Sequence, residues 1–145
     1  MSRLFITMRG TAGGVVLMVA AALFAGPVSR AADEDPGAEL KPVLSQPLPN
    51  VPGETLTAVV VNYAPGGKSG KHHHAGSVFA YVLSGAIRSA NSATGPVRVY
   101  EAGESFFEPP GSEHLVSENA SETEPASLLA VFVADDGARL TTFDR

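Results

Sequence analysis

The 145-residue chain contains no cysteine. Without cysteine no disulfide can brace the fold, even in an oxidising compartment, and no lipid can be attached to that residue. Packing, with a metal ion or a second subunit as possible additions, must therefore hold the folded chain together.

Basic residues are also scarce. The whole chain has 10 basic and 15 acidic residues, for a formal net charge of −5. If residues 1–31 are removed, three arginines and no acidic residue leave with them, and the formal net charge becomes −8. A surface this acidic repels phosphate backbones, so the composition argues against nucleic acid as a partner.

One uncharged apolar run stands out near the N-terminus. Arg3 and Arg9 precede this run at residues 12–25, and Ser29 and Ala31 place small side chains at the two positions that a signal peptidase reads. This layout predicts a secretory signal peptide at residues 1–31 and a periplasmic or secreted protein. The run is shorter than the roughly 18 residues of a spanning helix, so we expect no membrane association of the mature domain. An uncleaved N-terminal anchor is the alternative.

The segment at residues 32–53 is rich in acidic residues and contains five prolines. Proline disrupts both helices and sheet ladders, so the composition predicts an extended arm or linker. A strand-like section around Val43 and Leu44 is the alternative within this segment.

After residue 31, no stretch of twelve residues shows the 3.6-residue periodicity of a helix. Short β-branched runs instead recur at 8- to 12-residue intervals, separated by Gly, Pro and Asn. Residues 55–63, 77–85 and 126–134 show the pattern most clearly. It is typical of an all-β sandwich or barrel, and we expect one such domain at residues 54–137, followed by a tail at 138–145.

The run VFAYVL at residues 78–83 is apolar at both parities. A strand that is covered on one face only should alternate with polar residues. Either the N-terminal arm or another subunit must therefore cover its second face. Because symmetric dimers are common, we expect a homodimer through this strand.

Histidine is rare in this chain but clustered. Three of its four histidines are consecutive, at 72–74, and the fourth is His114. On a strand, residues two apart share a face, so His72 and His74 can point inward while His73 points away. Two imidazoles and a third from a distant strand would leave positions open for water or substrate on a metal. A solvated polar turn is the competing interpretation.

The wider spacing around these histidines resembles the two conserved motifs of the cupin superfamily. The resemblance covers about residues 54–135 and implies a small single-domain cupin, with a jelly-roll β-barrel around one divalent metal ion. His72, His74 and His114 are implied as its ligands, and iron, manganese, zinc, nickel and copper all remain candidates. The matching positions are Gly66, His72, His74 and Gly85 in the first motif and Gly103, Pro109, Gly111 and His114 in the second.

The chain departs from the cupin pattern at two positions. The first motif usually carries a Glu where this chain has Val78, and the second often closes with Asn where this chain has Glu118, followed by Asn119. Without the first Glu the implied site is three neutral imidazoles. Either Glu108 or water could take the place of the missing carboxylate, and the alternative for Glu108 is a solvated strand edge.

The resemblance implies a small-molecule ligand or substrate but does not identify it. The catalytic residues are unknown from the sequence, and three functions stay open: a metal-dependent enzyme of the cell envelope, a non-catalytic module that binds or senses a small ligand or a metal, and a structural metal site. Tyr81 and Arg98 are the candidate polar contacts to a ligand. Four aromatic residues are candidates to line a cavity above the metal, namely Phe79, Tyr81, Phe106 and Phe107.

Overall fold

A computed structural model describes residues 37–144 of the chain. The predicted signal peptide at residues 1–31 therefore lies outside the described residues. Every helix or strand position within residues 37–144 is occupied by a β-strand and none by a helix, which confirms the predicted all-β class. This part of the chain contains no helix that is long and apolar enough to cross a membrane.

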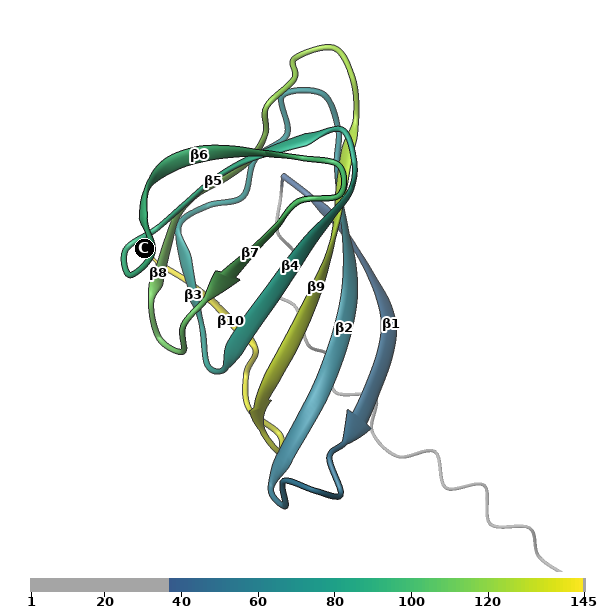
Figure 1. Ribbon diagram of the computed structural model, residues 1–145, viewed down its shortest axis with the longest axis vertical. Coiled ribbons are helices and arrows are strands. Elements are labelled where there is room, and N and C mark those ends of the chain that lie inside the picture. The colour runs from purple at the N-terminus through teal and green to yellow at the C-terminus, as the bar shows by residue number, and fades with distance from the viewer. Residues whose placement is uncertain (1–36, 145) are drawn as a thin grey trace, which may run out of the picture.

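Ten strands form two five-stranded antiparallel sheets, the arrangement of a jelly roll (Figure 1). The first sheet has the spatial order β1 (Glu39–Pro47), β2 (Glu54–Tyr63), β9 (Ala126–Asp135), β4 (Ser77–Ser84) and β7 (Ser105–Glu108). The second has the order β10 (Thr141–Phe143), β3 (His72–His74), β8 (Glu113–Asn119), β5 (Ala86–Asn91) and β6 (Gly95–Glu101). Neighbouring strands are mostly distant in sequence, so side chains far apart in the chain meet between the sheets.

The hydrophobic core lies between the two sheets and follows strand parity. Every second residue of β9, from Ala126 to Ala134, is buried, and its alternation matches the period of two expected of a strand. On β4 the buried residues are Val78, Ala80 and Val82. Val78, Val82 and Ile87 of β5 are the largest fully buried side chains, so both sheets contribute to the most deeply buried part of the core.

Two glycines make the turns that bring the motif strands together. Gly85 has φ of 68° and joins β4 to β5, and an added Cβ would meet the Pro125 carbonyl oxygen at 2.7 Å. Gly111 has φ of 70°, and its N–H donates a 2.8 Å hydrogen bond to the His74 carbonyl. Both φ values lie in the left-handed region that glycine adopts without strain. The β7–β8 turn is thus attached directly to the histidine strand.

Both ends of the described chain contain more sheet than the sequence predicts. The segment expected to be an arm or linker forms β1 over Glu39–Pro47, with a bulge between Pro42 and Leu44. Proline is tolerated there because β1 is an edge strand, whose outer N–H groups have no ladder partner. The segment expected to be a tail includes β10, which pairs with β3 and places Thr141 opposite His74.

The outer face of β4 is apolar and exposed. Phe79 and Leu83 each retain 45% of their exposure and Tyr81 retains 39%, whereas the alternate residues are buried. β1 does not cover this face, because it lies at the far edge of the same sheet (Figure 1). Among residues 37–144, the sequence-based expectation of a covered second face is therefore not met within one chain.

Candidate metal centre

The three predicted histidines meet inside the barrel. His72 and His74 are buried on one face of β3, and His114 of β8 lies directly opposite His72 in the antiparallel pairing. The ring centroid of His72 is 4.8 Å from that of His74 and 4.9 Å from that of His114. One ligand nitrogen from each ring can be chosen so that all three lie within 4.8 Å of one another.

His73 points the other way, as strand parity predicts. Its Nδ1 lies 3.2 Å from Oδ1 of Asp144, and both side chains are partly exposed. The short strand β3 thus separates two inward imidazoles from one outward imidazole by the period of two alone.

Backbone carbonyls fix the tautomers of the two β3 histidines. Nδ1 of His72 lies 2.7 Å from the Gly70 carbonyl oxygen, and Nδ1 of His74 lies 3.1 Å from the Leu140 carbonyl oxygen. A carbonyl oxygen only accepts, so each Nδ1 must carry the proton and each Nε2 the lone pair. Metal-binding imidazoles are usually oriented in this way, by a hydrogen bond from the ring nitrogen that does not bind the metal.

His114 is oriented in the opposite sense. Its Nε2 lies 2.8 Å from Oγ of Ser89, while its Nδ1 is buried and has no hydrogen-bond partner among the described residues. If Nε2 donates to Ser89, Nδ1 carries a lone pair that faces the other histidines. A buried polar atom without a partner is costly, and a metal ion would satisfy it. The residues present therefore fit a metal ion.

Glu108 also belongs to this site. Its side chain is only 3% exposed, so the sequence-based alternative of a solvated strand edge is wrong. Oε2 of Glu108 lies 3.1 Å from Nδ1 of His114 and 3.9 Å from Nε2 of His74. Glu108 pairs across the sheet with Val78, the position where the cupin motif usually has its Glu. Strand pairing thus brings a carboxylate from β7 to the place that β4 leaves apolar.

Burial shifts the pKa values of the ionisable groups at this centre. Desolvation lowers the pKa of His74 to about 4 and that of His114 to about 3, and the charge of His72 lowers both further. Desolvation also raises the pKa of Glu108 to about 7, against the opposing effect of a hydrogen bond from Asn91. Each shift favours the uncharged form, as expected where water is excluded.

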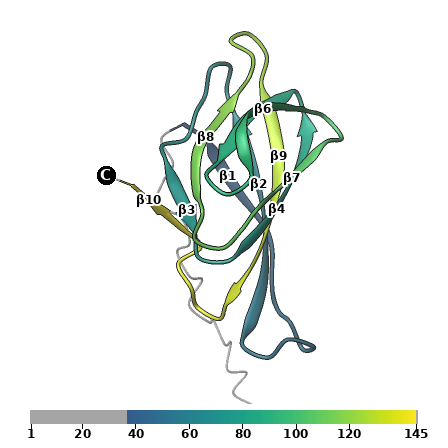
Figure 2. The same cartoon turned by 60° about the vertical axis from the view of Figure 1, so that its left-hand side comes forward.

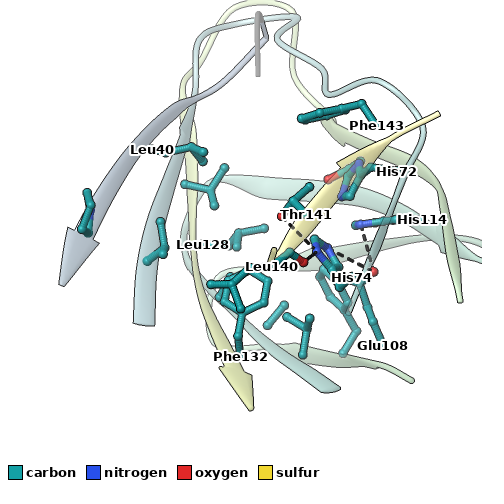
Figure 3. Close-up of a pocket in the computed structure, with 18 residues that line it drawn as sticks. Leu40, His72, His74, Glu108, His114, Leu128, Phe132, Leu140, Thr141 and Phe143 are labelled. Atoms are coloured by element: carbon teal, nitrogen blue, oxygen red, sulfur yellow. Dashed lines mark hydrogen bonds and ion pairs between the residues drawn. The ribbon is translucent and has the colours of Figure 1, made fainter. Parts of the chain in front are cut away.

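A cavity of about 160 Å³ adjoins the histidines (Figure 3). Its polar side carries His72, His114 and Glu108, while Leu40 and Leu128 lie on the opposite side. No lysine or arginine within residues 37–144 lines this cavity. The other apolar lining residues are Pro42, Val59, Val61, Val78, Ala80, Phe106, Ala130, Phe132, Leu140 and Phe143.

Most of the other predicted cavity residues lie outside the cavity. Phe106 does line it, but Phe79, Tyr81 and Phe107 are on the opposite face of the sheet and are exposed. Arg98 is on β6, 3.4 Å from Glu104 and above the ring of Tyr100. The prediction of Tyr81 and Arg98 as ligand contacts is therefore wrong for this cavity, because the parity of β4 and the edge position of β6 turn both away from it.

Sequence reasoning missed two polar residues behind the site. Ser89 and Asn91 of β5 are buried, and they contact His114 and Glu108 respectively. Both share the parity of the apolar Ile87 on the same strand. Polar side chains at inward positions of a strand are the signal that could have identified them.

The second motif departure has a structural explanation. Glu118 forms an ion pair with Arg88 at 2.6 Å, away from the cavity lining. Asn119 is buried, and its amide donates to the carbonyls of Ala64 and Glu124. The asparagine that the motif usually has at the position of Glu118 is therefore one residue later here. From that position its amide links the end of β8 to two loops.

Comparison with known proteins settles the family. A family model described as a cupin domain matches residues 59–132, which is half of the chain. This chain belongs to the cupin family. No curated protein matches the cupin significantly.

Solved structures similar to this cupin share its fold at low sequence identity. An uncharacterised conserved protein with a double-stranded β-helix domain from Klebsiella pneumoniae has a TM-score of 0.58 and 22% identity, over 79% of this chain and 90% of that one. The DMSP lyase DddQ from Ruegeria pomeroyi has a TM-score of 0.53 and 22% identity, over 61% of this chain and 42% of that one. Bacillus subtilis oxalate decarboxylase, a protein with Mn(II) centres, has a TM-score of 0.58 and 23% identity, over 77% of this chain and 29% of that one. This cupin thus spans less than half of either enzyme.

Proposed function

We propose that this protein is a metal-binding cupin of the cell envelope that holds a small molecule on one divalent ion at His72, His74 and His114. The observation that carries the proposal is the meeting of three buried imidazoles, of which His72 and His74 are held in the tautomer that a metal requires. A bound divalent ion would supply Lewis acidity to a carbonyl or carboxylate group of the small molecule.

The adjoining cavity supports a ligand site over a purely structural metal. A structural site is expected to be closed by its protein ligands, whereas here a cavity of about 160 Å³ opens beside the three rings. Its lining combines a few converging polar groups with many apolar ones, the usual make-up of a small-molecule site. We therefore expect a small ligand with a metal-binding oxygen group and an apolar body.

A non-catalytic binding or sensing module is the second candidate. One observation favours it: apart from the histidines, Glu108 is the single ionisable group that lines the cavity within residues 37–144. If Glu108 binds the metal, no further side chain remains there to act as a general base. Turnover would then have to rely on the metal and the ligand themselves.

Metal analysis of untagged protein, purified from its own compartment, tests the proposal. We expect one divalent ion per chain. His72→Ala, His74→Ala and His114→Ala should each reduce the metal content sharply, because each removes a ligand. His73→Ala is the matched control and should change nothing, since His73 contacts Asp144 on the outside. Equal losses from all four substitutions would contradict the assignment.

The envelope location and the homodimer remain proposals that rest on separate observations. The N-terminal sequence pattern supports a processed protein that begins near Ala32, and N-terminal sequencing that finds an intact Met1 would contradict it. The exposed apolar face of Phe79, Tyr81 and Leu83 supports a symmetric dimer, in which the same patch is buried on both subunits. Light scattering at micromolar concentration should give twice the chain mass, and a monomer would contradict the dimer.

A further inference from the structure

The shortest distance between a carboxylate and an imidazole in this cavity joins Glu108 and His114. Oε2 of Glu108 and Nδ1 of His114 lie 3.1 Å apart, and their geometry is not that of a hydrogen bond. If Nε2 of His114 donates to Ser89, its Nδ1 presents a lone pair towards the carboxylate oxygen. Two acceptors that face each other at this distance repel unless a positive charge lies beside both.

Among the described residues, no lysine or arginine lines the cavity to supply that positive charge. Glu108 is 3% exposed, so water cannot solvate its charge fully. Burying an unpaired carboxylate is costly, and buried charges are normally paired or coordinate metals. The charge balance of the cavity therefore leaves a place for a cation next to Glu108.

The carboxylate is also held in position. Nδ2 of Asn91 donates to Oε2 of Glu108 at 3.3 Å and to Oγ of Ser112 at 2.9 Å. The backbone N–H of Ala93 donates to Oδ1 of Asn91 at 2.9 Å, which fixes the orientation of the amide. An amide orients Glu108 without neutralising it, as outer residues do for metal-binding carboxylates.

We propose that Glu108 is the fourth protein ligand of the metal ion, so that the centre has three imidazoles and one carboxylate. This inference rests on the proposed function of the three histidines. The carboxylate reaches the ion from β7, across the sheet from Val78. One carboxylate on a 2+ ion leaves a net charge of +1, so the centre suits a small monoanionic or neutral ligand better than a dianion.

Metal affinity of Glu108→Gln tests the inference. This variant keeps the size of the side chain and removes its charge, and Glu113→Gln is the matched control on the exposed side of β8. Affinity for Co²⁺ and Mn²⁺ is measured by competition with a chelator at pH 8. We expect Glu108→Gln to bind about 10- to 100-fold more weakly, the scale of one lost charge-assisted contact, and Glu113→Gln to match the natural protein.

A relocated carboxylate provides the second arm of the experiment. Because Val78 and Glu108 are directly paired, the side chains at these two positions share a face. The double variant Val78→Glu/Glu108→Gln should therefore recover at least tenfold of the lost affinity. The visible spectrum of bound Co²⁺ should change in Glu108→Gln and return towards its original shape in the double variant.

The unfolding midpoint of chelator-treated protein separates an effect of Glu108→Gln on metal binding from an effect on folding. Glu108→Gln should melt at the same temperature or higher when no metal is bound, because it removes a buried charge. Unchanged metal affinity in Glu108→Gln, with metal binding lost in His114→Ala, would overturn the role of Glu108 and leave the three-histidine site intact. Unchanged metal binding in His114→Ala would overturn the proposed function itself.

Discussion

The cavity has one polar end and one apolar end, which differ in how the fold assembles them. The polar end combines His72 and His74 of β3, Glu108 of β7 and His114 of β8, and each is oriented by a specific hydrogen bond. The apolar end is made of side chains from β1, β2 and β9 that need only be of the right size. The polar end therefore depends on strand register. The apolar end depends on the alternation of apolar and polar residues along its strands and on the total volume of its side chains.

Truncation at the apolar end should have the largest effect on stability and should act independently of metal. Leu128 is 4% exposed and lines the side of the cavity opposite the histidines. We expect Leu128→Ala to lower the free energy of unfolding by about 2–5 kcal/mol, because it leaves a cavity in the core. The loss should be equal with and without metal in chemical denaturation. Val97→Ala, on the exposed side of β6, is the control and should stay within about 0.5 kcal/mol.

Substitution behind the polar end should instead affect metal binding. Ser89→Ala removes the hydrogen-bond partner of His114 Nε2 and with it the contact that orients this ring. We expect metal affinity to fall by about 10- to 100-fold, as is typical when a residue that hydrogen-bonds a metal ligand is replaced, with little change in the unfolding of the metal-free protein. Ser84→Ala removes a similar hydroxyl pair on the exposed side of β4 and should leave affinity unchanged. Equal affinities in the two variants would show that Ser89 has no positioning role.

The polar end should also make the metal-free protein sensitive to acid. Burial lowers the pKa of His74 to about 4 and that of His114 to about 3, so below pH 6.5 the unfolded chain takes up protons that the folded chain does not. Their contribution to stability is present above pH 6.5 and is lost as pH falls. Glu108 acts in the opposite direction: burial raises its pKa to about 7, so its contribution is present below pH 4.5 and is lost as pH rises through 7.

These opposing groups give a measurable slope. Between pH 4.5 and 6.5 the difference is about one proton, so the unfolding free energy should rise by about 1.4 kcal/mol per pH unit. Glu108→Gln removes the opposing group and should raise the slope to about 2.7 kcal/mol per pH unit. Urea denaturation of chelator-treated protein at several pH values measures both. A slope that is the same in the two proteins would mean that Glu108 is ionised throughout this range.

The apolar end should affect the selectivity of ligand binding, and this is the smallest of the effects that we expect. In metal-loaded protein, monocarboxylates from acetate to butyrate should bind more tightly by about fourfold for each added CH₂, the equivalent of about 0.8 kcal/mol. Titrations that follow the spectrum of bound Co²⁺ measure these affinities. Val61→Phe narrows the apolar end and should weaken butyrate more than acetate. Equal affinities along the series would place the bound anion away from the apolar end.

Much of the fold and of the site can be predicted from local sequence features. The alternation within strands, the glycines at turns and the two histidine motifs predict an all-β cupin barrel. Strand parity predicts that His72 and His74 share a face and that His73 does not, and the structure confirms this orientation. Metal binding by the three inward histidines stays a prediction.

Other features could not be read from local patterns. β4 is apolar on both faces, so its sequence does not say that Tyr81 faces outward. The edge strands β1 and β10 show little hydrophobic alternation. They form by pairing with β2 and β3, respectively. In β7 two phenylalanines in succession hide the parity that turns Glu108 inward.

Local sequence is enough to predict which residues alternate, where the chain turns and which side chains have the chemistry to bind a metal. These properties depend on steric and conformational preferences over a few residues. The position of Glu108 beside His114, and the contacts of Ser89 and Asn91 with them, are seen only in the folded barrel. Such contacts join strands through their register, and register is set by the packing of the whole barrel and not by any one segment.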